Sequence, residues 1–209
     1  MAPSIWRNRG YLPHFDDGIR TQHITFRLAD SLPNDAIKRI DSIILGMEES
    51  EQKIEKRRLM HEYLDAGKSC CVIKRPEYAQ LVQDAILHFD GERYEMYAWV
   101  IMPNHVHALL RPLGGWEILK IISTWKTFTA RRIPAEAYSE SSGRILRGKA
   151  GALRSDSQKP RVWQSEYWDR YIRNDKHFRI TKNYIEENPV KAGLCKKPED
   201  WQWSSAAFG

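Results

Sequence analysis

The sequence predicts an α+β protein in which helices pack against a mainly antiparallel sheet. Three observations support this: an alternating strand pattern near the N-terminus, two apolar segments joined by a Pro-Asn turn, and amphipathic helical patterns between and after them. Helices segregated against an antiparallel sheet are typical of this class. With 209 residues and no internal repeat, the chain fits a single domain.

In the first half of the chain, residues 22–30 (QHITFRLAD) alternate and hold β-branched residues, which predicts a strand. Isoleucines at helical spacing predict a helix from residue 34. The densely charged residues 48–67 then predict a solvated helix or a helical hairpin. Residues 76–91 predict another amphipathic helix, which begins at a proline and stops at a glycine.

In the second half, residues 93–102 and 105–112 predict two strands joined through Pro103 and Asn104, a pair that favours turns. Residues 115–133 predict a helix. Residues 139–161 hold six cations against two acids and lack apolar periodicity, which indicates a long basic loop. Residues 162–174 are expected to be extended. The helix after them is expected to end near Asn188, since a residue before proline avoids the α region.

The composition indicates a cytoplasmic protein. No apolar run approaches the roughly 18 residues of a membrane span, and the N-terminus lacks the apolar segment of a secretory signal. Three cysteines without a metal-binding or disulfide spacing point to a reducing compartment. No contact with a membrane is expected.

The positive charge is concentrated in the second half of the chain. Residues 1–100 carry 14 Lys and Arg against 16 Asp and Glu, a net −2, whereas residues 101–209 carry 19 against 11, a net +8. This asymmetry favours a polyanionic partner. Ordinary surface charge is the alternative at this point.

The segment MPNHVHALL contains the strongest chemical signal. Side chains two apart on a strand share a face, so His105 and His107 are expected to lie side by side. Two neutral imidazoles on a rigid strand supply two ligands to a divalent metal. The alternative is a pair of core histidines, each with a local hydrogen bond, and a metal site needs a third donor from elsewhere.

The last predicted helix offers further polar groups. Tyr184 and Asn188 are four residues apart and therefore on one helical face. A tyrosine can act as a nucleophile, and an asparagine can donate oxygen to a hard metal. Packing in the core is the common alternative for a helical tyrosine. Tyr167 and Tyr171 compete for the nucleophilic role, because spacing does not exclude them. No general base stands out.

Four separated segments carry a family resemblance: WVIMPNHVHALLRP, STWKTFTARRI, QSEYWDRYIRNDKHF and YIEENPVKAGL, followed by a closing PEDWQWSSAAF. They resemble the REP-associated tyrosine transposases, single-tyrosine members of the His-hydrophobic-His (HUH) nuclease superfamily. The similarity runs from about residue 18 to the C-terminus, with the motifs in the family's order.

The resemblance implies one domain over residues 1–209: a ferredoxin-like antiparallel sheet with helices packed on it, of the HUH endonuclease type. A helical insertion at about 34–66 and the basic loop at about 139–161 are expected within it. Residues 143–161 look longer than the family pattern. The implied partner is single-stranded or hairpin DNA resembling REP repeats, which suggests a nucleoid association. A monomer is expected rather than a dimer.

The resemblance also assigns roles. His105, His107 and Asn188 become ligands of Mg²⁺ or Mn²⁺, although relatives often carry Gln in place of Asn188. Tyr184 becomes the nucleophile, which forms a 5′-phosphotyrosine and releases a 3′-OH. Cations from two segments are expected to follow the phosphate backbone: Lys126, Arg131, Arg132, Arg170, Arg173 and Lys182.

Two other functions compete with this interpretation. One is a catalytically retired protein that binds hairpin DNA or RNA without cutting it; intact His105, His107 and Tyr184 argue against it. The other is a metal-dependent hydrolase of small phosphoesters, which the basic second half makes less favourable.

Overall fold

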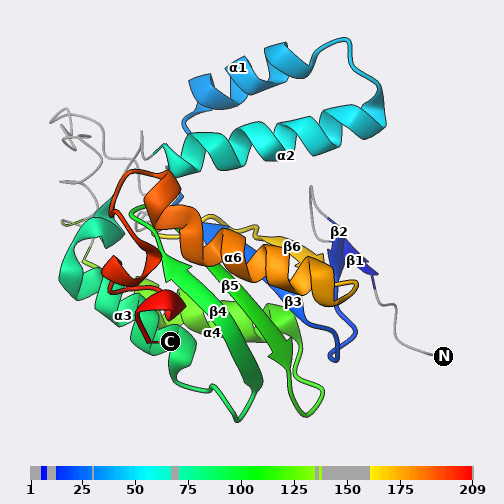
Figure 1. The fold of residues 1–209 in the computed structure, drawn as a ribbon. Helices are drawn as coiled ribbons and strands as arrows, with labels where there is room; N and C mark the ends of the chain where they lie inside the picture. The colour runs from blue at the N-terminus through cyan, green and yellow to red at the C-terminus, as the bar shows by residue number, and fades with distance from the viewer. Residues whose placement is uncertain are drawn as a thin grey trace, which may run out of the picture.

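The protein is built on a four-stranded antiparallel sheet with the strand order β4-β5-β3-β6 (Figure 1). The computed structural model describes residues 6–8, 13–29, 31–66, 71–134, 137 and 161–208. The strands of the sheet are β3 (Gln22–Arg27), β4 (Tyr94–Ile101), β5 (His105–Pro112) and β6 (Trp168–Tyr171). A separate two-stranded sheet, β1 (Trp6–Asn8) with β2 (Pro13–Phe15), contacts β6.

The connectivity explains the strand order. In the chain, β3 is followed by α3 (Pro76–Leu87), β4, β5, α4 (Ile118–Ala130) and β6. Strand β5 pairs antiparallel with both β4 and β3, and β6 pairs antiparallel with β3. The units β3-α3-β4 and β5-α4-β6 therefore interlock, which is the ferredoxin-like βαββαβ arrangement. The predicted fold class is confirmed.

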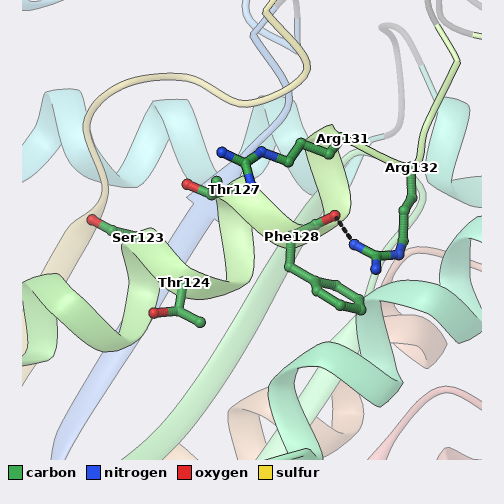
Figure 2. A pocket seen from close by; sticks show the side chains of 6 residues that line it. All are labelled: Ser123, Thr124, Thr127, Phe128, Arg131 and Arg132. Atoms are coloured by element: carbon green, nitrogen blue, oxygen red, sulfur yellow. Dashed lines mark hydrogen bonds between the residues drawn. The ribbon is translucent and has the colours of Figure 1, made fainter.

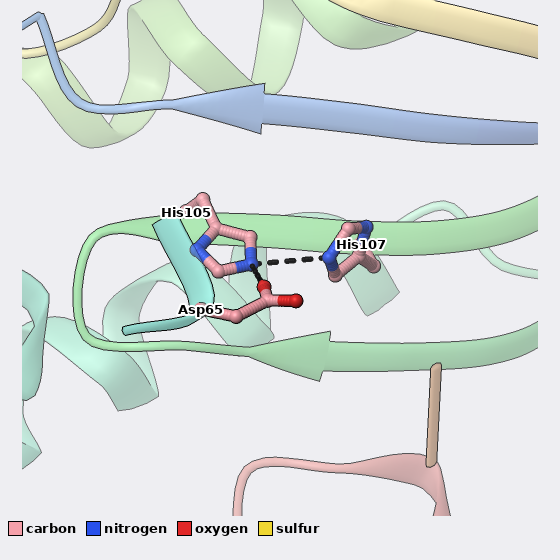
Figure 3. A group of neighbouring side chains, drawn as sticks. All are labelled: Asp65, His105 and His107. Carbon is pink, nitrogen blue, oxygen red and sulfur yellow. Dashed lines mark hydrogen bonds and ion pairs between the residues drawn. The ribbon is translucent and has the colours of Figure 1, made fainter. Parts of the chain in front are cut away.

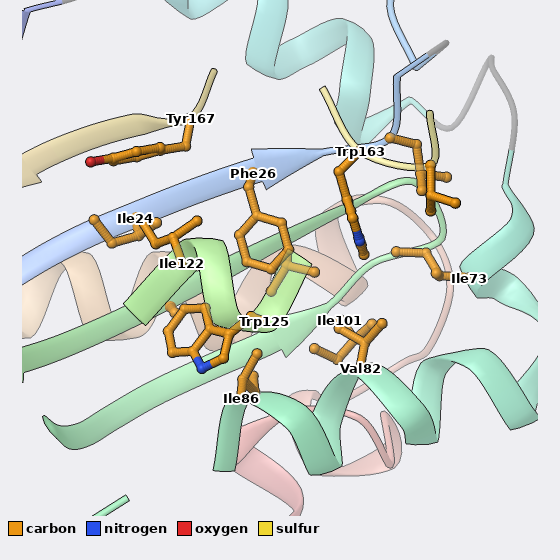
Figure 4. Close-up of a cluster of buried hydrophobic side chains, with 14 of the residues drawn as sticks. Ile24, Phe26, Ile73, Val82, Ile86, Ile101, Ile122, Trp125, Trp163 and Tyr167 are labelled. Carbon is orange, nitrogen blue, oxygen red and sulfur yellow. The ribbon is translucent and has the colours of Figure 1, made fainter. Parts of the chain in front are cut away.

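The two faces of the sheet have different functions. Helices α3 and α4 cover one face, where Phe26, Ile86 and Trp125 belong to the main apolar core (Figure 4). Because successive side chains of a strand point to opposite faces, the other face of β5 carries His105, His107 and Leu109. Helix α6 (Asp175–Lys191) packs on β4 and β5 at this second face, which we call the histidine face.

Helices α1 (Asn34–Ile44) and α2 (Glu49–Asp65) form a helical hairpin between β3 and α3 in the chain (Figure 1). Of the two alternatives for residues 48–67, a single helix is observed, and the predicted helix from residue 34 precedes it. In α1, residues Ala36, Ile40 and Ile44 are buried at helical spacing. Among the described side chains of α2, only Leu64 is buried. Helix α2 therefore contributes little to the apolar core.

The predicted end of the last helix near Asn188 is wrong, since α6 continues through Pro189 to Lys191. Pro189 lies in the final turn and is buried, so the helix loses one backbone donor there but keeps its packing. Beyond it, Ala192 N–H donates to Asn188 O, and Gly193 has a φ of +70°. A left-handed glycine is a common helix stop, and this glycine ends α6.

The other predicted strands and helices are present, with bounds that are mostly shorter than expected. The exception is the basic loop at 139–161, of which all but Arg161 lies outside the described residues. Within the described parts of the chain, no helix is both long enough and apolar enough to cross a membrane.

Candidate active site

His105 and His107 lie side by side on the histidine face of β5, as the strand alternation predicts. Both side chains are fully buried, and their Nε2 atoms are 3.0 Å apart. Strand β5 is an inner strand of the sheet, with β4 on one side and β3 on the other. The two imidazoles are therefore held by a rigid support.

A hydrogen-bonded chain fixes the orientation of His105. The amide of Asn104 donates to the carbonyl of Leu64 at 3.2 Å, so its oxygen Oδ1 is the atom that faces His105. That oxygen lies 2.7 Å from His105 Nδ1 and accepts a hydrogen bond from its N–H. His105 therefore presents the lone pair of Nε2 toward His107. The sequence indicated Asn104 only as a turn residue.

His107 is held by β3, whose Thr25 lies directly opposite it in the strand register. Its Nδ1 is 2.8 Å from Thr25 Oγ1 and 3.1 Å from Nε2 of His23. Burial lowers the pKa of His107 well below its usual value, and the neighbouring His105 lowers it further. His107 is thus neutral near pH 7. With a proton on Nδ1, His107 has a lone pair on Nε2. This lone pair points toward the same place as the Nε2 lone pair of His105.

Asp65, the last residue of α2, brings a carboxylate to these nitrogens. Its Oδ1 is 3.3 Å from His105 Nε2. One ligand atom each from Asp65, His105 and His107 lies within 4.8 Å of the other two (Figure 3). Two imidazole nitrogens and a carboxylate form a donor set that fits a divalent cation. The sequence analysis missed Asp65.

Asn188 reaches this cluster from α6. It is fully buried, and its Nδ2 donates to Asp65 Oδ1 at 3.4 Å. Its Oδ1 is buried and has no hydrogen-bond partner among the described residues. The residue predicted as third ligand therefore lies beside Asp65, with an amide oxygen that no described protein group satisfies.

Tyr184, one turn before Asn188, lies against the same cluster. Its ring centroid is 5.4 Å from that of His107 and 5.9 Å from that of His23. Its hydroxyl is 3.4 Å from Nδ1 of His61 on α2. Burial raises the pKa of Tyr184 above its usual value of 10.0, the charge of Asp65 raises it further, and Asn188 partly offsets the rise. The phenol is therefore protonated at neutral pH.

Tyr167 and Tyr171, the competing tyrosines, lie on the opposite face of the sheet. Tyr167 is buried in the main core. Tyr171 pairs with Gln22, which alternates with His23, so it shares the face covered by α3 and α4. The structure brings Tyr184, and neither of these two, to the histidines.

One face of helix α2 carries a row of polar side chains, although the dense charge of this segment predicts a helix exposed to solvent. Arg57, His61 and Asp65 are spaced four residues apart and so share one face of the helix. Burial, together with the neighbouring His105, lowers the pKa of His61 to about 4. Arg57 donates to the backbone carbonyl of Asp169 at 3.1 Å. Polar residues occur on every face of this densely charged helix, so their spacing alone does not single out these three.

Two predicted DNA contacts lie on β6 or just after it. Arg170 is exposed on the histidine face, because it pairs with His23. Arg173 is exposed three residues later, and its guanidinium is 5.9 Å from the ring of Tyr171. On α6, the ammonium of Lys182 forms an ion pair with Glu186.

Lys126 of α4 is engaged within the chain. Its ammonium donates to the carbonyls of Gln164, Ser165 and Glu166 at 2.9, 3.1 and 3.2 Å. Burial lowers the pKa of Lys126 to about 8. These hydrogen bonds hold the segment that leads into β6 against α4. The contact of Lys126 with DNA stays a prediction.

Arg131 and Arg132 line a surface hollow of about 540 Å³ at the end of α4, on the face of the protein opposite the histidines (Figure 2). The guanidinium of Arg132 stacks on Phe128 at 3.6 Å from the ring centroid and donates to the Phe128 carbonyl. Helix α4 contains no carboxylate. The remaining lining residues are hydroxyl-bearing: Ser123, Thr124 and Thr127.

The chain is similar to two curated transposases. A putative REP-associated tyrosine transposase of Haemophilus influenzae is 30% identical over 113 residues, which are 54% of this chain and 58% of the relative. The REP-associated tyrosine transposase of Escherichia coli K12 is 28% identical over 127 residues, which are 60% of this chain and 63% of the relative. The matches thus span less than two thirds of either relative. No family model matches the chain.

Among solved structures, a REP-associated tyrosine transposase bound to a REP hairpin superimposes with a TM-score of 0.55 at 20% identity. The match covers 96% of this chain and 84% of that one. The shared fold extends over nearly the whole chain, and the resemblance predicted from the sequence is confirmed.

Proposed function

We propose that this chain, a relative of the REP-associated tyrosine transposases, cleaves and rejoins single-stranded DNA beside a hairpin through a covalent tyrosine intermediate. One observation carries the proposal: Tyr184 of α6 lies against His107 in a cluster of metal-ligand side chains, with ring centroids 5.4 Å apart. A nucleophile beside a set of metal ligands is the arrangement that phosphoryl transfer requires.

In the proposed reaction, the hydroxyl oxygen of Tyr184 attacks the phosphorus of the scissile phosphodiester. A bond forms between this oxygen and phosphorus, and the bond from phosphorus to the 3′ oxygen breaks. The products are a 5′-phosphotyrosine and a strand that ends in a 3′-OH. The new ester replaces the old one, so a later 3′-OH can reverse the step without an external energy source.

His61 is the group placed to take the proton of Tyr184. Its Nδ1 lies 3.4 Å from the hydroxyl, within reach of a hydrogen bond from it. Proton transfer to a positioned base contributes typically 10²–10⁴-fold to a rate. On reversal, the same nitrogen returns the proton to the phenol oxygen. Helix α2 therefore contributes to the chemistry that the sequence left without a base.

His105 and His107, with Asp65 or Asn188, would hold a divalent ion such as Mg²⁺ or Mn²⁺. This fit is supported by the buried amide oxygen of Asn188, which has no hydrogen-bond partner among the described residues, and by the Nε2 atoms of His105 and His107, which lie 3.0 Å apart. When bound, such an ion supplies positive charge to the phosphate oxygens as charge builds on them. Thr25 and Asn104 keep the two imidazoles oriented.

The substrate is proposed to be a hairpin with a flanking single strand. The name of the solved relative, which was bound to a REP hairpin, supports the class of DNA. Arg170 is exposed on the histidine face and Arg173 is exposed three residues later, and both are proposed to contact the single strand. Because nucleophile and histidines come from the same chain, one copy contains the whole cluster, which supports action as a monomer.

The test is a covalent-attachment assay. A labelled single strand that flanks a hairpin, taken from repeats near this protein's own gene, is mixed with the protein and Mg²⁺ or Mn²⁺. The expected result is a denaturant-resistant protein-DNA adduct that requires the metal. Binding without an adduct in either metal would contradict the proposal and favour a retired DNA-binding protein. Turnover of a small phosphodiester without preference for DNA would favour a hydrolase.

A further inference from the structure

We infer that Asp65 is the third protein ligand of the divalent ion, and that ion binding thereby holds the α1–α2 hairpin against the sheet. The inference rests on the metal site of the proposed function and adds a ligand from an element outside the ferredoxin-like core. It also gives the hairpin a role: its second helix ends at the ligand.

The geometry favours Asp65 over Asn188 as the ligand. Asp65 Oδ1 is 3.3 Å from His105 Nε2, so a carboxylate oxygen already lies at the imidazole nitrogens. The Asn188 side chain turns its Nδ2 toward this carboxylate. An amide nitrogen that donates to the carboxylate orients the ligand, as partners behind metal ligands commonly do. Asn188 is therefore a positioning residue.

The chemistry of the donor atoms also favours Asp65 over Asn188 as the ligand. A carboxylate carries negative charge and binds hard divalent cations more strongly than a neutral amide oxygen. Of the three side chains whose ligand atoms converge, Asp65 is the one that brings a carboxylate to the cation.

The contacts of α2 with the sheet explain why the ion would matter for docking. Only Leu64 of its described side chains is buried, so apolar burial contributes little. Its hydrogen bonds to the sheet and to α6 are polar contacts: Leu64 O accepts from Asn104, Arg57 donates to Asp169 O, and His61 meets Tyr184. A ligand that binds only the docked state stabilises that state increasingly as its concentration exceeds the dissociation constant.

Docking of α2 also prepares His105. The carbonyl of Leu64 fixes the Asn104 amide, and that amide fixes the proton of His105 on Nδ1. A hairpin that leaves the sheet removes both the Asp65 carboxylate and the group that holds the His105 tautomer. Metal affinity and hairpin docking are therefore reciprocal, as any pair of linked equilibria must be.

The test uses the full chain with Mn²⁺ as the probe and needs no DNA. Binding is measured by the decrease of the free Mn²⁺ electron paramagnetic resonance signal, and docking by amide hydrogen exchange of residues 49–65. Asp65→Asn keeps the shape of the side chain and removes its charge. The control is Glu62→Gln, an exposed change of the same charge on the same helix.

The expected results are specific to Asp65. Mn²⁺ slows exchange in residues 49–65 of the wild type and of Glu62→Gln. Asp65→Asn weakens Mn²⁺ binding by about tenfold or more and abolishes this slowing. Unchanged exchange protection in β5 shows that the variant is folded.

Three outcomes would overturn the inference. Wild-type affinity in Asp65→Asn, combined with abolished affinity in Asn188→Ala, would make Asn188 the ligand and leave the proposed function intact. Mn²⁺ binding without slower exchange in α2 would remove the link to docking. Equal Mn²⁺ binding by wild type and His105→Ala would show that the histidines do not bind the ion. That outcome would contradict the proposed function as well.

Discussion

The hydroxyl of Tyr184 lies 3.4 Å from Nδ1 of His61, a residue 123 positions earlier in the chain. The first belongs to α6, which packs on β4 and β5, and the second belongs to α2, which lies beside α6 (Figure 1). A phenol whose pKa is raised by burial is a poor nucleophile unless a neighbour takes its proton. This contact therefore determines which substitutions should separate chemistry from DNA binding.

Replacement of Tyr184 by Phe should abolish covalent attachment to hairpin DNA. The change removes one oxygen and almost no volume, so folding and DNA affinity should remain near wild type. Denaturing gel analysis of a labelled strand measures the adduct. The matched control is Tyr171→Phe, which removes the same oxygen on the opposite face of the sheet and should retain the adduct. A reactive Tyr184→Phe protein, or an adduct mapped by mass spectrometry to Tyr167 or Tyr171, would contradict the assignment.

Replacement of His61 by Ala should slow adduct formation by about 10²–10⁴-fold, because the phenol then lacks its proton acceptor. His61→Asn retains a hydrogen-bond acceptor without basicity, so it should be comparably slow if proton transfer is the role of His61. Single-turnover rates at saturating DNA give the measurement. His88→Ala, at the end of α3, is the control. A His61→Asn protein that reacts at the wild-type rate would reduce His61 to a residue that only orients Tyr184.

Replacement of His105 or His107 by Ala should abolish cleavage and leave DNA affinity within a few-fold. The two imidazoles act locally at the phosphate, whereas affinity comes from cations distributed over the surface. Filter binding and cleavage of the same hairpin substrate, measured in parallel, test both halves of this statement. Full cleavage by either variant would contradict the proposal that β5 carries a metal site.

Lys126 should give the protein a measurable pH dependence of stability. Its pKa is about 8 in the folded protein, against 10.5 as the ordinary value expected in the unfolded chain, so between these values the unfolded chain binds more protons. The free energy of unfolding should therefore rise with pH from about 8 to about 10.5. Below pH 8 the cost of the buried charge is fully present.

The comparison with Lys126→Met isolates this effect. The wild-type free energy of unfolding minus that of the variant should rise across the window by at most about 1.4 kcal/mol per pH unit. Urea denaturation at several pH values measures it. Lys120→Met, an exposed change on the same helix, should show no such rise. A flat difference for Lys126→Met would mean that the ammonium remains hydrated.

Arg131 and Arg132 should bind phosphates of the DNA. The double change to Ala is expected to lower the slope of log affinity against log salt by about 0.7–0.9 for each phosphate that these arginines neutralise. The exposed adjacent pair Lys38 and Arg39 on α1, changed to Ala in the same way, controls for net charge. Equal slopes for the two double variants would show that the hollow on α4 does not touch DNA.

Local pattern determined much of the fold. The alternation of residues 105–112 was enough to put His105 and His107 on one face, because the two-residue period of a strand depends only on backbone geometry. The four-residue spacing of Tyr184 and Asn188 likewise put both on one side of α6. The one clear local error, the end of α6, arose because buried packing of Pro189 and the stop at Gly193 outweighed the preference of a residue before proline.

The tertiary structure decided which residues meet. Nothing local in the charged helix α2 distinguishes Asp65 and His61 from the solvated Glu62, since the sequence does not state which face of a helix the sheet will cover. Likewise, Tyr167, Tyr171 and Tyr184 were equivalent by residue type, and strand pairing placed the first two on the far face. The sequence by itself determined the elements and the two histidines, because those depend on short-range periodicity. The proposed third ligand and proton acceptor depend on how α2 and α6 pack at β5, which only the folded chain defines.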